Sequence, residues 1–134
     1  MIRRYKFEIL IFLFLVLIRI PSLGHDSFNT DVCRWKTRTY NFSNGIFSGD
    51  FGQTLQMYHP GVTLMWLGTA GIKVYNLYYD LTIGGEPASN SLNTVFGLNV
   101  AQKYFVTFAI SFAITLSFYV LRRLFGLKYA AVSL

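Results

Sequence analysis

The chain has 134 residues, of which 53% are hydrophobic, 18% aromatic and only 13% charged. Soluble domains carry about 25% charged residues, so this composition argues against an ordinary soluble globule and favours a membrane protein. The net charge of +6 is concentrated near the two ends and leaves no basic face in the middle, so we expect no nucleic-acid partner.

The first predicted element is the apolar stretch from Phe7 to Leu23. At about 1.5 Å per residue it nearly covers a hydrocarbon core of about 30 Å, and it can span a membrane if Glu8 and Arg19 snorkel to the interfaces. The alternative is a signal peptide cleaved near Gly24. The charge of Arg19 inside the stretch favours a retained transmembrane helix.

A helix is predicted over residues 30–47, because Trp35, Thr39, Phe42 and Ile46 recur at helical spacing. Asp31 falls in its first turn, where the positive end of a helix favours a carboxylate. The amphipathic pattern predicts that this helix lies along the membrane.

A second helix is predicted over residues 60–79, with Pro60 suited to its first position and apolar residues nearly all round. Gly61, Gly68, Gly71 and Lys73 interrupt its apolar surface. We therefore expect an interfacial helix rather than a further span, and a spanning helix is the alternative.

Residues 82–99 are rich in Gly, Ser and Asn and are predicted to form a loop. Residues 104–121 carry no charge and predict a second transmembrane helix. Arg122 and Arg123 after it, together with the basic residues before Phe7, place both termini in the cytoplasm and residues 24–103 outside. The renewed apolar stretch over 124–134 predicts the start of a possible third helix, and we expect the chain to be the N-terminal part of a longer protein.

The expected fold is thus an all-α, multi-pass integral membrane protein in which two transmembrane helices flank an outer loop with two interfacial helices. Asp31 is either a functional acid at the membrane face or a helix-start acid paired with Arg34. His59 before Pro60 either donates to an anion or is simply a polar interfacial residue. Asp50 after Gly49 either forms a turn or contributes to a substrate site.

Five short segments of the chain follow one another in an order that is informative as a set: Arg19–Gly24, Thr30–Trp35, Phe47–Phe51, His59–Gly68 and Leu121–Gly126. This order resembles the N-terminal part of GT-C membrane glycosyltransferases. The resemblance is to the branch that includes protein O-mannosyltransferases and bacterial lipid A aminoarabinose transferases. It covers nearly the whole chain and implies a larger multi-span GT-C fold that begins here.

The resemblance implies roles for individual residues. Asp31 matches the catalytic base at the start of the first outer helix, and it is followed by Val32 where the family usually has a second acid. His59 matches the basic residue that contacts the phosphate of the lipid-linked donor, with Arg34 and Asp50 as further substrate-binding candidates. Tyr58 stands where some relatives have a metal-binding acid, so we carry over no metal, and no cofactor is expected.

The implied activity is transfer of a hexosyl or pentosyl group from a polyprenyl-phosphate-linked donor to an acceptor hydroxyl on the outer face of a bacterial plasma membrane. The acceptor can be a glycan, a lipid or a protein, and we do not expect the 134 residues to be active alone. Two alternatives remain open at this point. One is a non-catalytic two-span scaffold or assembly subunit, and the other is a secreted binding domain.

Overall fold

The computed structural model describes residues 5–24, 30–56, 61–88 and 91–132. Within these ranges the regular secondary structure is helical and no strand occurs, which confirms the all-α class. The contacts divide the chain into two compact units: Met1–Pro21 with Thr107–Leu134, called here the terminal unit, and Ser22–Val106, the central unit. Helix α4 (Leu92–Phe125) contributes to both.

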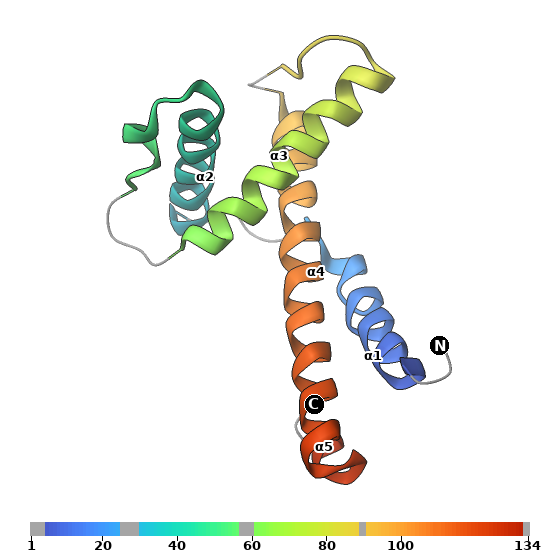
Figure 1. Cartoon of the computed structure of the whole chain (residues 1–134). Coiled ribbons are helices and arrows are strands. Elements are labelled where there is room, and N and C mark those ends of the chain that lie inside the picture. The colour runs from blue at the N-terminus through green and yellow to red at the C-terminus, as the bar shows by residue number, and fades with distance from the viewer. Residues whose placement is uncertain (1–4, 25–29, 57–60, 89–90, 133–134) are drawn as a thin grey trace. The chain divides into compact units, whose positions relative to one another are not determined.

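The central unit contains the two helices predicted for the outer segment. Helix α2 (Thr30–Ser48) is followed by the 3₁₀ turn η3 (Phe51–Thr54), and helix α3 (Val62–Thr82) comes next (Figure 1). The predicted helices over 30–47 and 60–79 are therefore confirmed, with α3 shifted two to three residues along the chain. Helix α2 ends where Gly49 adopts a φ of +76°, a backbone conformation that glycine adopts without steric cost.

Glycines in α3 allow close helix packing and leave the helix unbroken. An ideal Cβ on Gly68 would lie 2.5 Å from Cγ2 of Thr39 on α2, and one on Gly71 would lie 2.6 Å from the Cα of Gln102 on α4. Between α2 and α3, the rings of Phe42 and Trp66 meet edge to face at a centroid distance of 5.3 Å. Gly68 and Gly71, which interrupt the apolar pattern of α3, are thus points of close approach to neighbouring helices.

Helix α4 begins earlier than the sequence predicts, so the predicted loop over 82–99 is wrong from residue 92 onward. Ser91 stabilises this start, because its Oγ accepts a hydrogen bond from the backbone N–H of Thr94 at 3.0 Å. The polar residues of this stretch from 92 onward therefore belong to a capped first turn and the turns after it. The transmembrane helix predicted over 104–121 is the later part of this single 34-residue helix.

In the described part of the chain, α4 is the one helix that is both long and apolar enough to cross a membrane, and 17% of its most apolar window is buried. Helix α1 (Lys6–Leu17) has 12 residues and is about 18 Å long. The helix predicted over 7–23 therefore ends six residues early. Pro21, inside the 3₁₀ turn η2 (Ile20–Ser22), lacks the backbone donor that a continuing α-helix needs.

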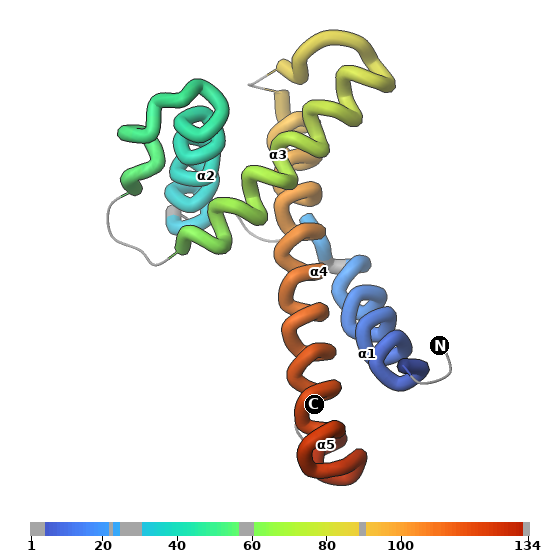
Figure 2. The backbone as a smooth tube through the Cα atoms, in the orientation of Figure 1, coloured from blue at the N-terminus to red at the C-terminus, as the bar shows by residue number. Residues whose placement is uncertain are grey.

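In the terminal unit, α1 lies alongside the later part of α4 (Figure 2). Glu8 is 7% exposed and forms an ion pair with Arg122. Arg19 Nη1 donates to Oγ of the buried Ser111 at 3.3 Å. Both side chains therefore find partners on α4, and their snorkelling to the interfaces stays a prediction.

The end of the chain forms a short helix, α5 (Leu127–Val132), where the start of a third helix is predicted over 124–134. Gly126 separates it from α4 with a φ of +89°. A residue in that conformation interrupts an α-helix, so α5 is a separate element of six residues.

Candidate functional site

Asp31 lies in the first turn of α2 with its side chain exposed. Arg34, almost one turn further along, is also exposed, and in the described ranges these two residues form no ion pair with each other. The interpretation of Asp31 as a helix-start acid paired with Arg34 is therefore not realised. Its carboxylate is accessible to a ligand and sits where a helix favours negative charge.

Asp50 lies beyond the opposite end of α2 from Asp31. Asp50 precedes η3 and is exposed, and its Oδ2 accepts a hydrogen bond from Nε2 of Gln53 at 2.8 Å. The carbonyl of Asp50 accepts the backbone N–H of Gln53 at 3.1 Å, so this acid organises the turn after α2. His59 lies outside the described residues.

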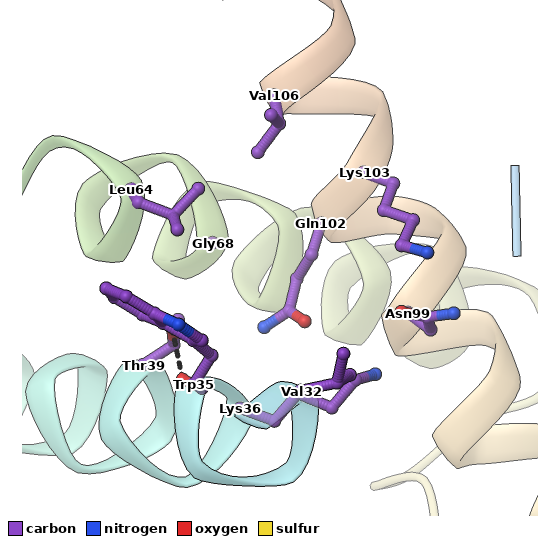
Figure 3. A pocket seen from close by; sticks show the side chains of 10 residues that line it. All are labelled: Val32, Trp35, Lys36, Thr39, Leu64, Gly68, Asn99, Gln102, Lys103 and Val106. Carbon is purple, nitrogen blue, oxygen red and sulfur yellow. Dashed lines mark hydrogen bonds between the residues drawn. The ribbon is translucent and has the colours of Figure 1, made fainter. Parts of the chain in front are cut away.

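A pocket of about 220 Å³ lies among α2, α3 and α4 within the central unit (Figure 3). Ten residues line it, and they come from three separate stretches of the chain: Val32, Trp35, Lys36, Thr39, Leu64, Gly68, Asn99, Gln102, Lys103 and Val106. No acidic residue is among the ten.

Helix α2 supplies one wall of the pocket through residues that share one of its faces. Val32, Trp35 and Thr39 are spaced three and four residues apart, which brings their side chains onto the same side of a helix. Thr39 Oγ1 donates to the backbone carbonyl of Trp35 at 2.9 Å, which holds Thr39 against its own helix (Figure 3). Asp31 directly precedes the wall residue Val32, so the accessible acid and the pocket belong to the same turn of α2.

Lys36 brings a positive charge to this wall and is partly buried. Burial lowers the pKa of Lys36 below its usual 10.5, and the neighbouring Cys33 acts in the opposite direction with a smaller effect. Lys36 therefore carries its charge in surroundings that solvate it poorly.

Helix α4 supplies the opposite wall, where two amides and a second lysine face the pocket. Asn99, Gln102, Lys103 and Val106 recur at helical spacing on α4 (Figure 3). Sequence reasoning singled out none of the four as a site residue, because Asn99 fell in the predicted loop and Val106 in the predicted transmembrane helix. Their spacing is the signal that could have identified them.

In the described part of the chain, His, Cys, Asp and Glu form no group that could hold a metal ion. Comparison of the whole chain with protein-family models, with curated proteins and with solved structures finds no match. The function therefore has to be argued from the residues and their geometry.

Proposed function

We propose that this chain is part of a membrane glycosyltransferase of the GT-C kind, which moves a sugar from a polyprenyl-phosphate-linked donor to an acceptor hydroxyl. The observation that carries the proposal is the exposed carboxylate of Asp31 in the first turn of α2, which is not neutralised by Arg34. The order of sequence segments that resembles GT-C enzymes supports the same assignment.

Asp31 acts as the general base in this proposal. It takes the proton of the acceptor hydroxyl as the acceptor oxygen bonds to the sugar, and the bond between the sugar and the donor phosphate breaks. A carboxylate in this role contributes roughly 10²- to 10⁴-fold to the rate. The exposure of Asp31 leaves room for an acceptor to approach it.

The proposed membrane arrangement has two spans, α1 with the turn that follows it and α4. The ion pair between Glu8 and Arg122 supports this pairing, because it joins the beginning of α1 to the end of α4. The two helices are then antiparallel, which brings Lys6 and Arg123 to the same side of the bilayer. The positive residues at that side favour a cytoplasmic location for both termini.

Helices α2 and α3 are proposed to lie at the outer interface of the bilayer. Large apolar side chains are exposed along η3 and α3, including Phe51, Leu77 and Leu81. Trp66 and Tyr78 are also exposed, and such side chains are enriched where a membrane meets water. A lipid-linked donor is presented at this depth, which is where Asp31 would act.

The experiment measures release of free polyprenyl phosphate by the purified full-length enzyme of which this chain is proposed to be a part, in lipid vesicles, with a panel of polyprenyl-phosphate hexose and pentose donors and short alcohol or glycan acceptors. Asp31→Asn should reduce turnover by roughly 10²-fold or more while the helix content stays unchanged. The matched control is Asp80→Asn, because Asp80 is an exposed acid near the end of α3. Near-normal turnover by Asp31→Asn contradicts the proposal. So does a failure of every donor in the panel to support release of polyprenyl phosphate.

A further inference from the structure

The end of the terminal unit where α1 begins carries a group of exposed cations. Lys6 lies in the first turn of α1, Arg123 in the last turn of α4 and Lys128 in α5, and all three side chains are exposed. The fold brings them to one end, because Glu8 of α1 pairs with Arg122 of α4 and α5 follows α4 directly (Figure 2). Lys6, Arg123 and Lys128 are called here the cationic end.

An aromatic pair holds two of these cations close to each other. The ring centroids of Tyr5 and Tyr119 are 6.1 Å apart, and Cζ of Arg123 lies 5.8 Å from the centroid of the Tyr119 ring. Lys6 directly follows Tyr5 in the chain. The two charges therefore flank one pair of tyrosine rings, and tyrosine is a residue type enriched where a membrane meets water.

The acid in this unit does not neutralise the cationic end. Glu8 is the one acid in the sequence of the terminal unit, and it is 7% exposed and paired with Arg122. In the described part of the chain, none of the three exposed cations forms an ion pair. Like charges that gather on one surface raise the local concentration of anions, so the cationic end favours a negatively charged partner.

Exposed apolar side chains alternate with these cations and restrict the kind of anion. Phe7 is 53% exposed, Leu124 is 68% exposed and Tyr129 is 73% exposed, and each directly follows one of the three cations in the chain. A soluble anion would leave these side chains facing water. A bilayer surface covers them, because apolar side chains enter the boundary of the acyl chains while Lys and Arg reach the headgroups.

We infer that the cationic end binds the headgroups of anionic phospholipids. The ammonium groups of Lys6 and Lys128 and the guanidinium of Arg123 donate to the phosphate oxygens, and the neighbouring apolar side chains enter the bilayer. A zwitterionic headgroup is a poorer partner, because its own ammonium balances the phosphate. The inference rests on the part of the proposed function that places α1 and α4 in a bilayer, and it does not depend on sugar transfer at Asp31.

The first test uses the unmodified chain in phosphatidylcholine vesicles that contain a trace of spin-labelled phosphatidylglycerol or spin-labelled phosphatidylcholine. Electron spin resonance measures how much of each lipid is immobilised at the protein surface. One basic residue near an anionic surface favours binding about fivefold, and lipids along the rest of the protein dilute this preference, so phosphatidylglycerol should associate at least about twofold more strongly at low salt. At about 1 M salt the preference should disappear, because charges are then screened within about 3 Å. Equal association of the two lipids at low salt would overturn the inference.

Substitutions then locate the preference. The triple variant Lys6→Gln, Arg123→Gln and Lys128→Gln should bring the two lipids to nearly equal association. The matched control is Lys6→Arg, Arg123→Lys and Lys128→Arg, which keeps all three charges and should keep the preference. Lys73→Gln, which removes an exposed cation of the central unit, should keep it as well.

A neutral triple variant that keeps both its helical circular dichroism and the full preference for phosphatidylglycerol would overturn the inference. If the triple variant loses its helical signal, the three single substitutions to glutamine replace it, and each should lower the preference. An unchanged preference in all three single variants would also overturn the inference.

Competition distinguishes a lipid headgroup from free phosphate. Millimolar inorganic phosphate, added at constant ionic strength, should leave the preference for phosphatidylglycerol unchanged, because the free ion covers none of the exposed apolar side chains. Loss of the preference would identify a site for free phosphate and overturn the lipid assignment. Both leaflets of the vesicles have the same composition, so the result does not depend on the orientation of the protein. If Asp31→Asn abolishes turnover but the unmodified chain shows no lipid preference, the transfer proposal stands and this inference is rejected.

Discussion

Gly71 of α3 lies directly against the backbone of Gln102 on α4. A Cβ at position 71 would be 2.6 Å from the Cα and 2.8 Å from the N of Gln102. Real Cβ atoms do not approach backbone atoms so closely, so α3 and α4 can keep this contact only while residue 71 has no side chain. The contact helps to hold together two of the three helices that line the pocket.

Gly71→Ala should therefore destabilise the central unit by about 1 to 3 kcal/mol, even though alanine is the better helix former by about 1 kcal/mol. The backbone of α4 cannot yield as a side chain does, so no change of side chain at Gln102 should restore stability. The measurement is the free energy of unfolding in mixed micelles. A stabilised Gly71→Ala variant would contradict the close approach.

Gly68 provides a matched contrast, because its neighbour is a side chain. A Cβ there would lie 2.5 Å from Cγ2 of Thr39 but 3.3 Å from Oγ1. Gly68→Ala should be destabilising alone, and Thr39→Ser, which removes Cγ2, should restore most of the loss. The double variant therefore departs from additivity by about 0.5 to 3 kcal/mol. Strict additivity would show that Thr39 is not the obstacle.

How much of this arrangement can be predicted from sequence differs between α2 and α4. The helical recurrence of Trp35, Thr39 and Phe42 comes from one face of α2 being buried, so periodicity alone identifies that helix. The start of α4 is polar, and its helical conformation depends on the Ser91 cap and on packing against α3. Composition alone favours a loop there, and tertiary contacts overrule it.

The pocket shows a second limit of prediction from sequence, which concerns residues that come together only in the folded chain. Asp31 can be singled out from its place at a helix start, which is a local property. Lys36 and Lys103 belong to helices far apart in the chain, and nothing local indicates that they line one cavity. Likewise Glu8 and Arg122 are individually visible as charges beside apolar stretches, but their ion pair follows only from the packing of α1 on α4.

That ion pair makes a prediction for the terminal unit. Glu8→Gln keeps the size of the side chain and removes the carboxylate that faces the largely buried guanidinium of Arg122. Breaking a buried pair costs about 3 to 5 kcal/mol, and because Arg122 keeps some exposure we expect a loss near the lower end. The measurement is the free energy of unfolding in mixed micelles.

The paired substitution distinguishes the ion pair from the mere loss of a polar group. Glu8→Leu combined with Arg122→Leu should be less destabilising than the sum of the two single changes. Arg123→Leu is the control, since Arg123 is exposed and loses only its contact with the Tyr119 ring at 5.8 Å, so it should change stability by no more than about 1 kcal/mol. A control effect as large as that of Arg122→Leu would argue for a general charge effect at the end of α4.

The proposed topology is tested by cysteine labelling in intact cells. Cys33 is exposed and is first replaced by serine. In that background Glu86→Cys should react with a membrane-impermeant thiol reagent, and Lys128→Cys should react only after permeabilisation, because basic residues flanking a span favour the cytoplasm. Both positions are exposed, so differences in labelling report the side of the membrane. Labelling of both in intact cells would contradict the two-span arrangement.

Lys36 makes stability depend on pH in a definite direction. Burial lowers its pKa in the folded protein below the usual 10.5 that applies when the chain is unfolded. As pH rises through the interval between the folded and the unfolded pKa, Lys36 loses its proton in the folded protein while it still holds that proton in the unfolded chain. The free energy of unfolding therefore rises with pH across this interval. Below the interval, the destabilisation caused by the partly buried charge of Lys36 is fully present.

The measurement compares the free energy of unfolding at about pH 7.5 and about pH 10 in a Cys33→Ser background, which removes the thiol that acts on Lys36 in the opposite direction. Lys36→Met should be more stable than its parent at the lower pH and should lose the part of the rise that comes from Lys36. Lys73→Met should keep the full rise, because Lys73 is exposed. If Lys36→Met and Lys73→Met rise equally, the titrating group is not Lys36, and the argument that its charge sits in poorly solvating surroundings is wrong.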